Sequence, residues 1–70
     1  LNVEARLKAA LAHLQETHGN TVRLTHQDLG NIIGSTRETV SRQLKKWERK
    51  GHLKIKKDRI VLIENFSNDF

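Results

Sequence analysis

Hydrophobic residues in the first half of the chain recur at helical spacing in two separate segments. From Val3 to Leu14 they repeat every three or four residues, which predicts an amphipathic helix over residues 2–18. A second helix is expected to begin at Thr25, where the hydroxyl can accept from a free amide and Asp28 can reach back to complete a capping box. Its predicted buried face consists of Leu29, Ile32 and Ile33. Its predicted end is Gly34, because the turn there calls for a positive φ.

A third helix is predicted over residues 36–50, and it carries one apolar stripe. Val40, Leu44 and Trp47 lie at i, i+4 and i+7, so they share a single face. Gly51 follows as the expected C-terminal stop.

Short β-prone runs account for most of the remaining sequence. Residues 21–24 predict a brief strand or an extended link, and residues 53–57 and 59–63 predict a hairpin around Asp58. Two helices joined by a glycine-containing turn form a helix-turn-helix, and a hairpin directly after them is a wing. The sequence therefore predicts an α+β fold, a winged helix-turn-helix. Residues 1–70 are expected to be one domain, with the helix-turn-helix at about 25–50 and the wing at about 53–63.

The composition limits the classes of protein that fit this fold. The 70 residues contain no cysteine, so neither disulfides nor thiolate metal sites are available. They contain no methionine either and begin at Leu1, whereas a native bacterial chain begins with methionine, so we expect a fragment of a longer protein. The longest aliphatic run, Ile60 to Ile63, is far too short to cross a bilayer, so we expect a soluble, cytoplasmic protein.

Positive charge is concentrated in one part of the chain. Residues 37–59 contain ten basic and three acidic residues, so this stretch carries +7 while the rest carries −2. Such an asymmetry favours a polyanionic partner. A solvated, lysine-rich surface is the alternative that composition alone leaves open.

The polar face of the third helix carries the candidate chemistry. When the apolar stripe points inward, the residues on the opposite face are Glu38, Arg42, Lys45 and Arg49, and those nearer its edge are Arg37 and Ser41. A recognition helix requires this division, with side chains at its N-terminal end that reach base edges. Arg37 and Arg42 can each present a planar fork to O6 and N7 of guanine, and Glu38 can accept from the amine of cytosine.

Two structural explanations compete with base recognition by these residues. Ser35 and Glu38 also match a capping box, in which Glu38 closes the helix end. Alternatively, Arg42 and Lys45 belong to an ordinary solvated face, with Glu38 and Arg42 forming a surface ion pair that contributes little.

Residues 24–42, LTHQDLGNIIGSTRETVSR, resemble the helix-turn-helix of the catabolite activator and fumarate–nitrate regulator (CRP/FNR) superfamily. The resemblance continues through residues 44–51 into the hairpin, and the segment GSTRETVSR is highly specific. It implies a homodimeric transcription factor with an effector-binding β-barrel and a long dimerisation helix outside this chain, and RNA polymerase as a further partner of the parent. No cofactor is expected in this domain, and the effector of the sensor is unknown.

Position by position, the resemblance implies a role for each polar residue of the helix-turn-helix. It places Arg37, Glu38 and Arg42 on the bases of a GTGA-like half-site. Ser41 stands where some members have glycine and others a serine or threonine that adds a base contact. The expected phosphate contacts are Thr25, Gln27, Thr36 and Thr39, together with the basic residues Lys45, Lys56, Lys57 and Arg59. The wing departs from members with a glycine-centred turn, since its tip is the tight, charged tripeptide at residues 57–59.

Other functional classes receive less support from the sequence. No nucleophile elbow, paired carboxylate or phosphate loop is present, so we do not expect an enzyme. His13 and His18 are five residues apart without a cysteine or acidic cluster, so we expect no metal site. The alternative function is a winged helix that contacts an acidic protein partner. The outward Arg37, Glu38 and Arg42 argue against it, because protein interfaces favour exposed aromatic residues at such a position.

Overall fold

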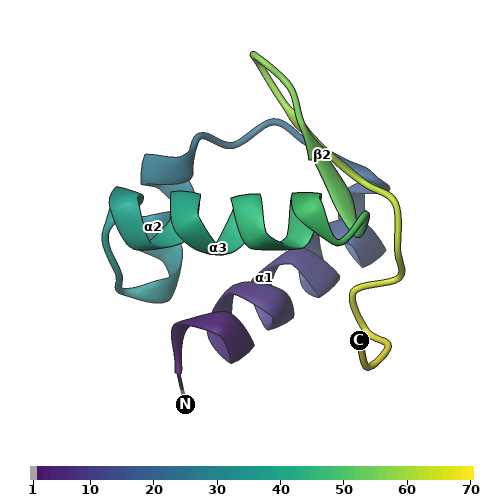
Figure 1. The fold of residues 1–70 in the computed structure, drawn as a ribbon, viewed down its shortest axis with the longest axis horizontal. Helices are drawn as coiled ribbons and strands as arrows, with labels where there is room; N and C mark the ends of the chain where they lie inside the picture. The colour runs from purple at the N-terminus through teal and green to yellow at the C-terminus, as the bar shows by residue number, and fades with distance from the viewer. Residues whose placement is uncertain (1) are drawn as a thin grey trace.

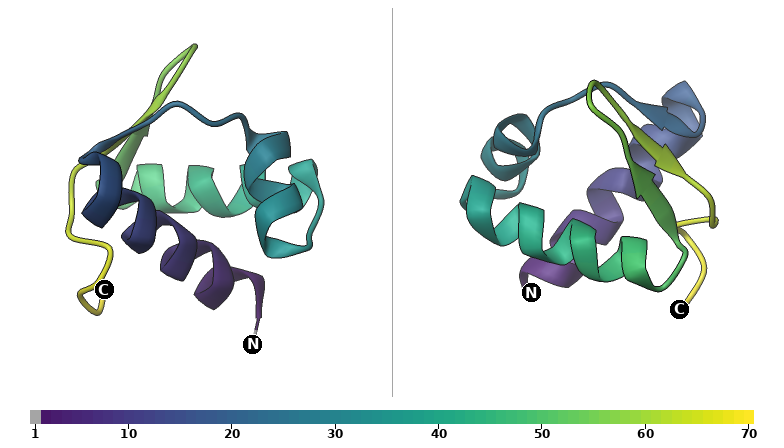
Figure 2. Two further views of the ribbon diagram at one scale, coloured as in Figure 1. Left: turned by 180° about the vertical axis from the view of Figure 1, so that it is seen from behind. Right: turned by 45° about the horizontal axis from the view of Figure 1, so that its top comes forward.

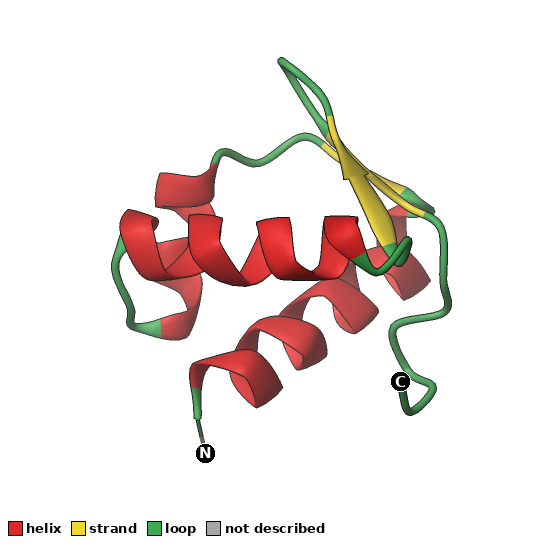
Figure 3. Cartoon of the chain, in the orientation of Figure 1, coloured by secondary structure: helices red, strands yellow, loops and turns green. Residues whose placement is uncertain are grey.

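The structure is a computed structural model that describes residues 2–70, and Leu1 lies outside the described residues. Three helices and three short strands follow one another in the order that the sequence predicts (Figures 1 and 3). They are α1 (Val3–His18), β1 (Thr21–Val22), α2 (His26–Ile33), α3 (Arg37–Arg49), β2 (Leu53–Ile55) and β3 (Ile60–Leu62). The predicted α+β winged helix-turn-helix is confirmed.

The three strands form one small antiparallel sheet in the order β1-β3-β2. Val61 in the central strand β3 is opposite Lys54 of β2 and Thr21 of β1. All three predicted strands are shorter than expected, because residues 23–24 leave the sheet and residues 56–59 form the hairpin loop. The loop projects away from the three helices (Figures 1 and 2). The pairing of β1 with β3 anchors the base of this wing directly after α1.

Side-chain caps define where α2 begins and ends. The Thr25 hydroxyl accepts from the Asp28 N–H at 3.0 Å, and the Thr25 N–H donates to the Asp28 carboxylate at 3.0 Å. The predicted capping box is therefore present. Gly34 adopts the left-handed conformation with φ 71°, which ends the helix as predicted.

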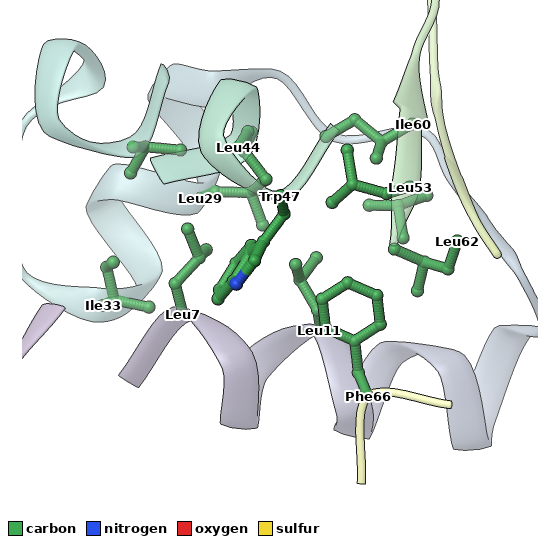
Figure 4. Packing of buried hydrophobic residues seen from close by; sticks show 12 residues of the cluster. Leu7, Leu11, Leu29, Ile33, Leu44, Trp47, Leu53, Ile60, Leu62 and Phe66 are labelled. Atoms are coloured by element: carbon green, nitrogen blue, oxygen red, sulfur yellow. The ribbon is translucent and has the colours of Figure 1, made fainter. Parts of the chain in front are cut away.

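One core joins all three helices to the sheet (Figure 4). Leu7 and Leu11 of α1 face the predicted stripe of α3, where Val40, Leu44 and Trp47 are all buried. Residues 64–70, a C-terminal tail without helix or strand, contribute Phe66, whose ring meets that of Trp47 edge-on at 5.4 Å between centroids. Its backbone N–H donates to the Gln15 side-chain oxygen at 2.9 Å, so residues 64–66 are attached to α1.

The predicted burial of Ile32 is wrong. Its side chain is 58% exposed, whereas Leu29, Gly30 and Ile33 form the buried face of α2. At about 100° per residue, those three positions span an arc of roughly 100°, and Ile32 lies on the far side of Leu29. An eight-residue helix that packs through one narrow face leaves the flanking position in solvent.

Gly30 allows α2 and the start of α3 to approach closely. The Ser35 N–H donates to the Gly30 carbonyl at 2.8 Å. A Cβ at residue 30 would lie 3.1 Å from the Ser35 carbonyl oxygen and 3.2 Å from the Thr36 carbonyl carbon. Because both neighbours are backbone atoms, any larger residue would have to move the turn that positions α3.

Candidate nucleic-acid interface

The N-terminus of α3 is capped by Thr36, not by Ser35. The Thr36 hydroxyl oxygen accepts from the Thr39 N–H at 3.2 Å. The capping-box explanation of Glu38 is therefore wrong, because Glu38 is the second helical residue and not the third. Its exposed carboxylate lies near the positive end of the helix dipole, which favours an acidic residue there without a specific contact.

The predicted division of α3 into a buried and an outward face is confirmed. Arg37, Glu38, Arg42, Lys45 and Arg49 are all exposed, on the helix that buries the core stripe. The ion pair between Glu38 and Arg42, which one of the competing explanations requires, does not form among residues 2–70. The Arg42 guanidinium instead donates to the Thr39 hydroxyl over a long 3.3 Å, which leaves most of its donors free.

The two threonines predicted as phosphate contacts differ in their free hydrogen-bonding groups. The Thr36 hydroxyl donates to the Thr39 hydroxyl at 2.9 Å, so its only hydrogen is used within the cap. The Thr39 hydroxyl accepts from both Thr36 and Arg42 and keeps its own hydrogen. Of the two hydroxyls, only that of Thr39 therefore has a hydrogen free to donate to a further acceptor.

Ser41 has a partner that sequence reasoning missed. The His26 Nδ1 lies 2.7 Å from the Ser41 hydroxyl oxygen, and both side chains are half-buried between α2 and α3. A signal for this contact was present in the sequence. His26 precedes Leu29 and Ile33 by three and seven residues, which places it on the buried face of α2.

The pKa of His26 is lowered from its ordinary value of 6.5. Partial burial is the largest cause, and the positive charges of Arg37 and Lys45 lower it further. The imidazole is therefore mostly neutral at pH 7.

Two shallow hollows bring most of the predicted contact residues together. One is lined by Thr25, His26, Gln27, Arg37 and Ser41, so it contains both expected phosphate contacts and expected base contacts. The second contains Thr25 and His26 again, together with the wing residues Lys56, Lys57 and Arg59. The start of α2 thus lies between the recognition helix and the wing on one face.

Charges at the tip of the wing partly neutralise one another. The Asp58 carboxylate accepts from the Arg59 guanidinium at 2.7 Å and lies 3.7 Å from that of Arg23. The hydrogen bond from Arg59 is the main reason that the pKa of Asp58 is lowered, so this carboxyl is negative at pH 7. None of the ion pairs among residues 2–70 involves Lys56 or Lys57, and both are exposed.

A second residue missed from the sequence, Glu48, connects α3 to the wing. Its carboxylate accepts from the Ile55 N–H at 2.7 Å. Ile55 belongs to β2, the edge strand next to the hairpin loop, so this bond holds the wing against the end of the recognition helix.

Neither a metal cluster nor a membrane span occurs in the described part of the chain. Residues 2–70 contain no group of three histidine, aspartate or glutamate side chains that could hold a metal ion. None of the helices in this range is long and apolar enough to cross a membrane.

This chain resembles known proteins in both sequence and fold. Electron transport regulator A of Shewanella oneidensis is 31% identical over 91% of this chain, which spans only 29% of that protein's length. A CRP/FNR-family transcriptional regulator of Thermus thermophilus matches with a TM-score of 0.82 and 29% identity, over 94% of this chain and 38% of its own. A putative regulator of the same family from Eubacterium rectale, 23% identical, matches in fold with a TM-score of 0.86 over 91% of this chain and 30% of its own.

These relatives are named as regulators and not as enzymes, in agreement with the expectation from the sequence. Residues 5–67 match the profile of the Crp-like helix-turn-helix domain, which spans nearly all of the chain. The exposed basic recognition helix, the capped helix-turn-helix and the wing are the features of such a domain. The chain belongs to the Crp-like helix-turn-helix domain family, the DNA-binding domains of CRP/FNR transcription regulators.

Proposed function

We propose that this domain binds double-stranded DNA with α3 in the major groove, where Arg37, Glu38 and Arg42 contact the bases of a GTGA-like half-site. The observation that carries the proposal is their common exposure on the outward face of α3, whose opposite face is fixed in the core. An α-helix fits the major groove, where guanine offers two acceptors to an arginine fork and cytosine offers a donor to a carboxylate.

Phosphate contacts on both sides of α3 complete the proposed interface. Thr25, Gln27 and Thr39 keep polar groups exposed beside the recognition helix, and Lys45 adds charge from α3 itself. The capping box leaves the first N–H groups of α2 available, and these suit a phosphate oxygen. On the wing, Lys56 and Lys57 are expected to contribute more than Arg59, because Asp58 offsets the charge of Arg59.

We further propose that residues 1–70 act as the DNA-binding domain of a longer, homodimeric, cytoplasmic regulator. The relatives are much longer than this chain, and a dimer would place two recognition helices one helical turn apart. The domain alone should therefore bind a half-site weakly, and fusing two copies to a coiled coil should strengthen binding markedly. Tight, cooperative binding of the unfused domain to a palindrome would contradict this arrangement.

Substitution of Arg42 tests base recognition directly. Arg42→Ala should cost about 1–3 kcal/mol on the specific half-site and relax selectivity at one base pair. Arg42→Lys should recover little of the loss, because an ammonium group cannot bond two acceptors of guanine with a planar fork. The measurement is selection from a randomised half-site library at fixed salt, with a scrambled duplex as the reference.

Glu38→Ala distinguishes a base-contacting carboxylate from a surface charge. Affinity for random DNA should rise as a repulsive charge is removed, while discrimination at one base pair falls. The free energy of unfolding should fall by only about 0.3–1 kcal/mol, because a negative charge is lost at the N-terminus of α3 while its cap at Thr36 is retained. Equal binding of the wild-type domain to specific and scrambled duplexes would instead favour a protein partner.

A further inference from the structure

The contact between His26 and Ser41 lies in the proposed interface, and protonation of His26 changes the hydrogen-bonding groups that face the DNA. The Nδ1 of His26 and the hydroxyl of Ser41 are 2.7 Å apart, so one hydrogen lies between them. Ser41 lies one residue before Arg42 and lines the same hollow as Arg37. His26 is the first residue of α2 and lies on the helix face that also carries the buried Leu29 and Ile33.

We propose that His26 is a positioning residue that determines whether Ser41 presents a hydrogen-bond donor or only an acceptor to the major groove. The inference rests on the proposed function, because it assumes that α3 lies in the groove. When Nδ1 is unprotonated, it accepts the only hydrogen of the Ser41 hydroxyl, which then offers lone pairs alone. When the imidazole is protonated, Nδ1 donates to Ser41, and the hydroxyl hydrogen is free to point toward a base.

These two states favour opposite orientations of a G·C pair. A hydroxyl donor suits guanine, which presents the acceptors O6 and N7 in the major groove. A hydroxyl that only accepts suits cytosine, which presents the N4 amine. The base preferred at the pair facing Ser41 therefore depends on the protonation of His26, while the pairs contacted by Arg37 and Arg42 do not.

The charges around His26 favour the neutral state in the free domain and the protonated state on DNA. Partial burial is the largest cause that lowers the pKa of His26, and the charges of Arg37 and Lys45 on α3 oppose a charge on the ring as well. The charged residues that line a hollow with His26 from the β1–α2 link and the wing are Arg23, Lys56, Lys57, Asp58 and Arg59. All but Asp58 are positive. DNA phosphates would offset this positive field, so binding should raise the pKa of His26 and take up a proton.

The test compares two half-site duplexes that differ only by inversion of the G·C pair facing Ser41. Fluorescence anisotropy of the 70-residue chain gives the ratio of the two affinities at about pH 8 and about pH 5.5, on either side of the histidine range. The ratio should shift by about two- to tenfold toward the guanine orientation at the lower pH, as one hydrogen bond changes direction. Inversion of the pair contacted by Arg42 should have the same effect at both pH values.

Ser41→Ala and His26→Gln should each give a ratio that does not change with pH. His13→Gln is the matched control, because His13 is exposed on α1, and it should keep the wild-type pH dependence. If a thermal melt shows that His26→Gln does not fold, Ser41→Ala still tests the inference. This variant should fold, because Ser41 is outside the core cluster and alanine favours a helix. A pH-independent wild-type ratio, or an unchanged pH effect in Ser41→Ala, overturns the inference. Failure of the proposed function looks different, because the wild type then prefers no duplex at either pH.

A measurement without DNA tests the hydrogen bond itself. Nitrogen-15 shifts of the His26 ring should show Nδ1 as the unprotonated nitrogen in the neutral free domain, and Ser41→Ala should move that resonance. A neutral ring protonated at Nδ1, or a resonance unmoved by Ser41→Ala, contradicts the proposed bond regardless of any result with DNA.

Discussion

Replacing Phe66 with alanine is expected to destabilise the domain strongly, although this residue lies in a tail with no regular secondary structure. Its side chain is 1% exposed and packs beside Trp47 and Leu11 (Figure 4). Truncating a buried phenylalanine costs about 3–5 kcal/mol, from lost burial and from the cavity that remains. The edge-on contact with Trp47 at 5.4 Å is part of this loss.

That loss is large compared with the stability of such a small domain. At about 0.05–0.15 kcal/mol per residue, a chain of this length has roughly 3.5–10 kcal/mol in total. Phe66→Ala should therefore leave a marginally stable or largely unfolded chain at room temperature. Urea denaturation followed by circular dichroism gives the difference in midpoint.

Phe70 supplies the matched control for this experiment. Its ring also meets Trp47 edge-on, at 6.3 Å, but it is 43% exposed. Phe70→Ala should cost about 1–2 kcal/mol, because only just over half of its side chain is buried and its removal leaves no enclosed cavity. A loss below about 1 kcal/mol for Phe66→Ala, or equal losses for the two variants, would refute the assignment of Phe66 to the core.

Three other substitutions test separate parts of the structure. Gly30→Ala should destabilise the domain by about 1 kcal/mol in chemical denaturation, because the gain in helix propensity is smaller than the cost of displacing the Ser35 carbonyl 3.1 Å from the new Cβ. Lys57→Ala should weaken specific and random DNA binding about equally and lower the slope of log affinity against log salt by roughly one unit. His26→Gln should make the free energy of unfolding less dependent on pH in the acid range. Because the pKa of His26 is lowered in the folded state, the unfolded wild-type chain binds more protons, so the wild type loses stability as pH falls below 6.5 and through the folded-state pKa, whereas the variant does not.

The sequence was sufficient to predict the helices because their signals are local. Val40, Leu44 and Trp47 have no competing periodicity, and the capping box at Thr25 and the left-handed turn at Gly34 depend on neighbouring residues only. Local signals were not sufficient to place the N-terminal cap of α3. The cap is Thr36 and not the neighbouring Ser35, and which of the two caps the helix depends on how the turn packs against Gly30.

Residues whose placement depends on distant parts of the chain could not be predicted. Phe66 is a single aromatic residue in a polar tail, and its burial follows from its contact with α1 and Trp47, far away in sequence. The burial predicted for Ile32 was wrong for the opposite reason, because its hydrophobicity suggested burial while its side chain is exposed on α2. The pairing of β1 with β3 was equally hidden, since a two-residue strand carries almost no pattern.

For the interface, the residue types and the outward face were predictable, but the bonds among the polar groups were not. Helical periodicity was enough to place Arg37, Glu38 and Arg42 on the surface of α3. It placed Ser41 at the edge of that face, but it gave no information on the bonding partner of Ser41, because His26 lies on another helix. The expected pairing of Glu38 with Arg42 failed because exposed side chains at this spacing gain little from an ion pair, and Arg42 turns instead toward Thr39.

The recognition helix therefore depends on two separate sets of contacts. Its inner stripe packs in the core, and this packing determines whether the domain folds. Its orientation relative to α2 and the wing depends on the close turn at Gly30, the bond from Ser41 to His26, and the Glu48 carboxylate on the backbone of β2. These three contacts lie at the start, middle and end of α3, and none of them contributes much to the buried apolar surface. The position of the side chains proposed to contact bases can thus change while the fold is retained, which would separate the specificity of DNA binding from the stability of the domain.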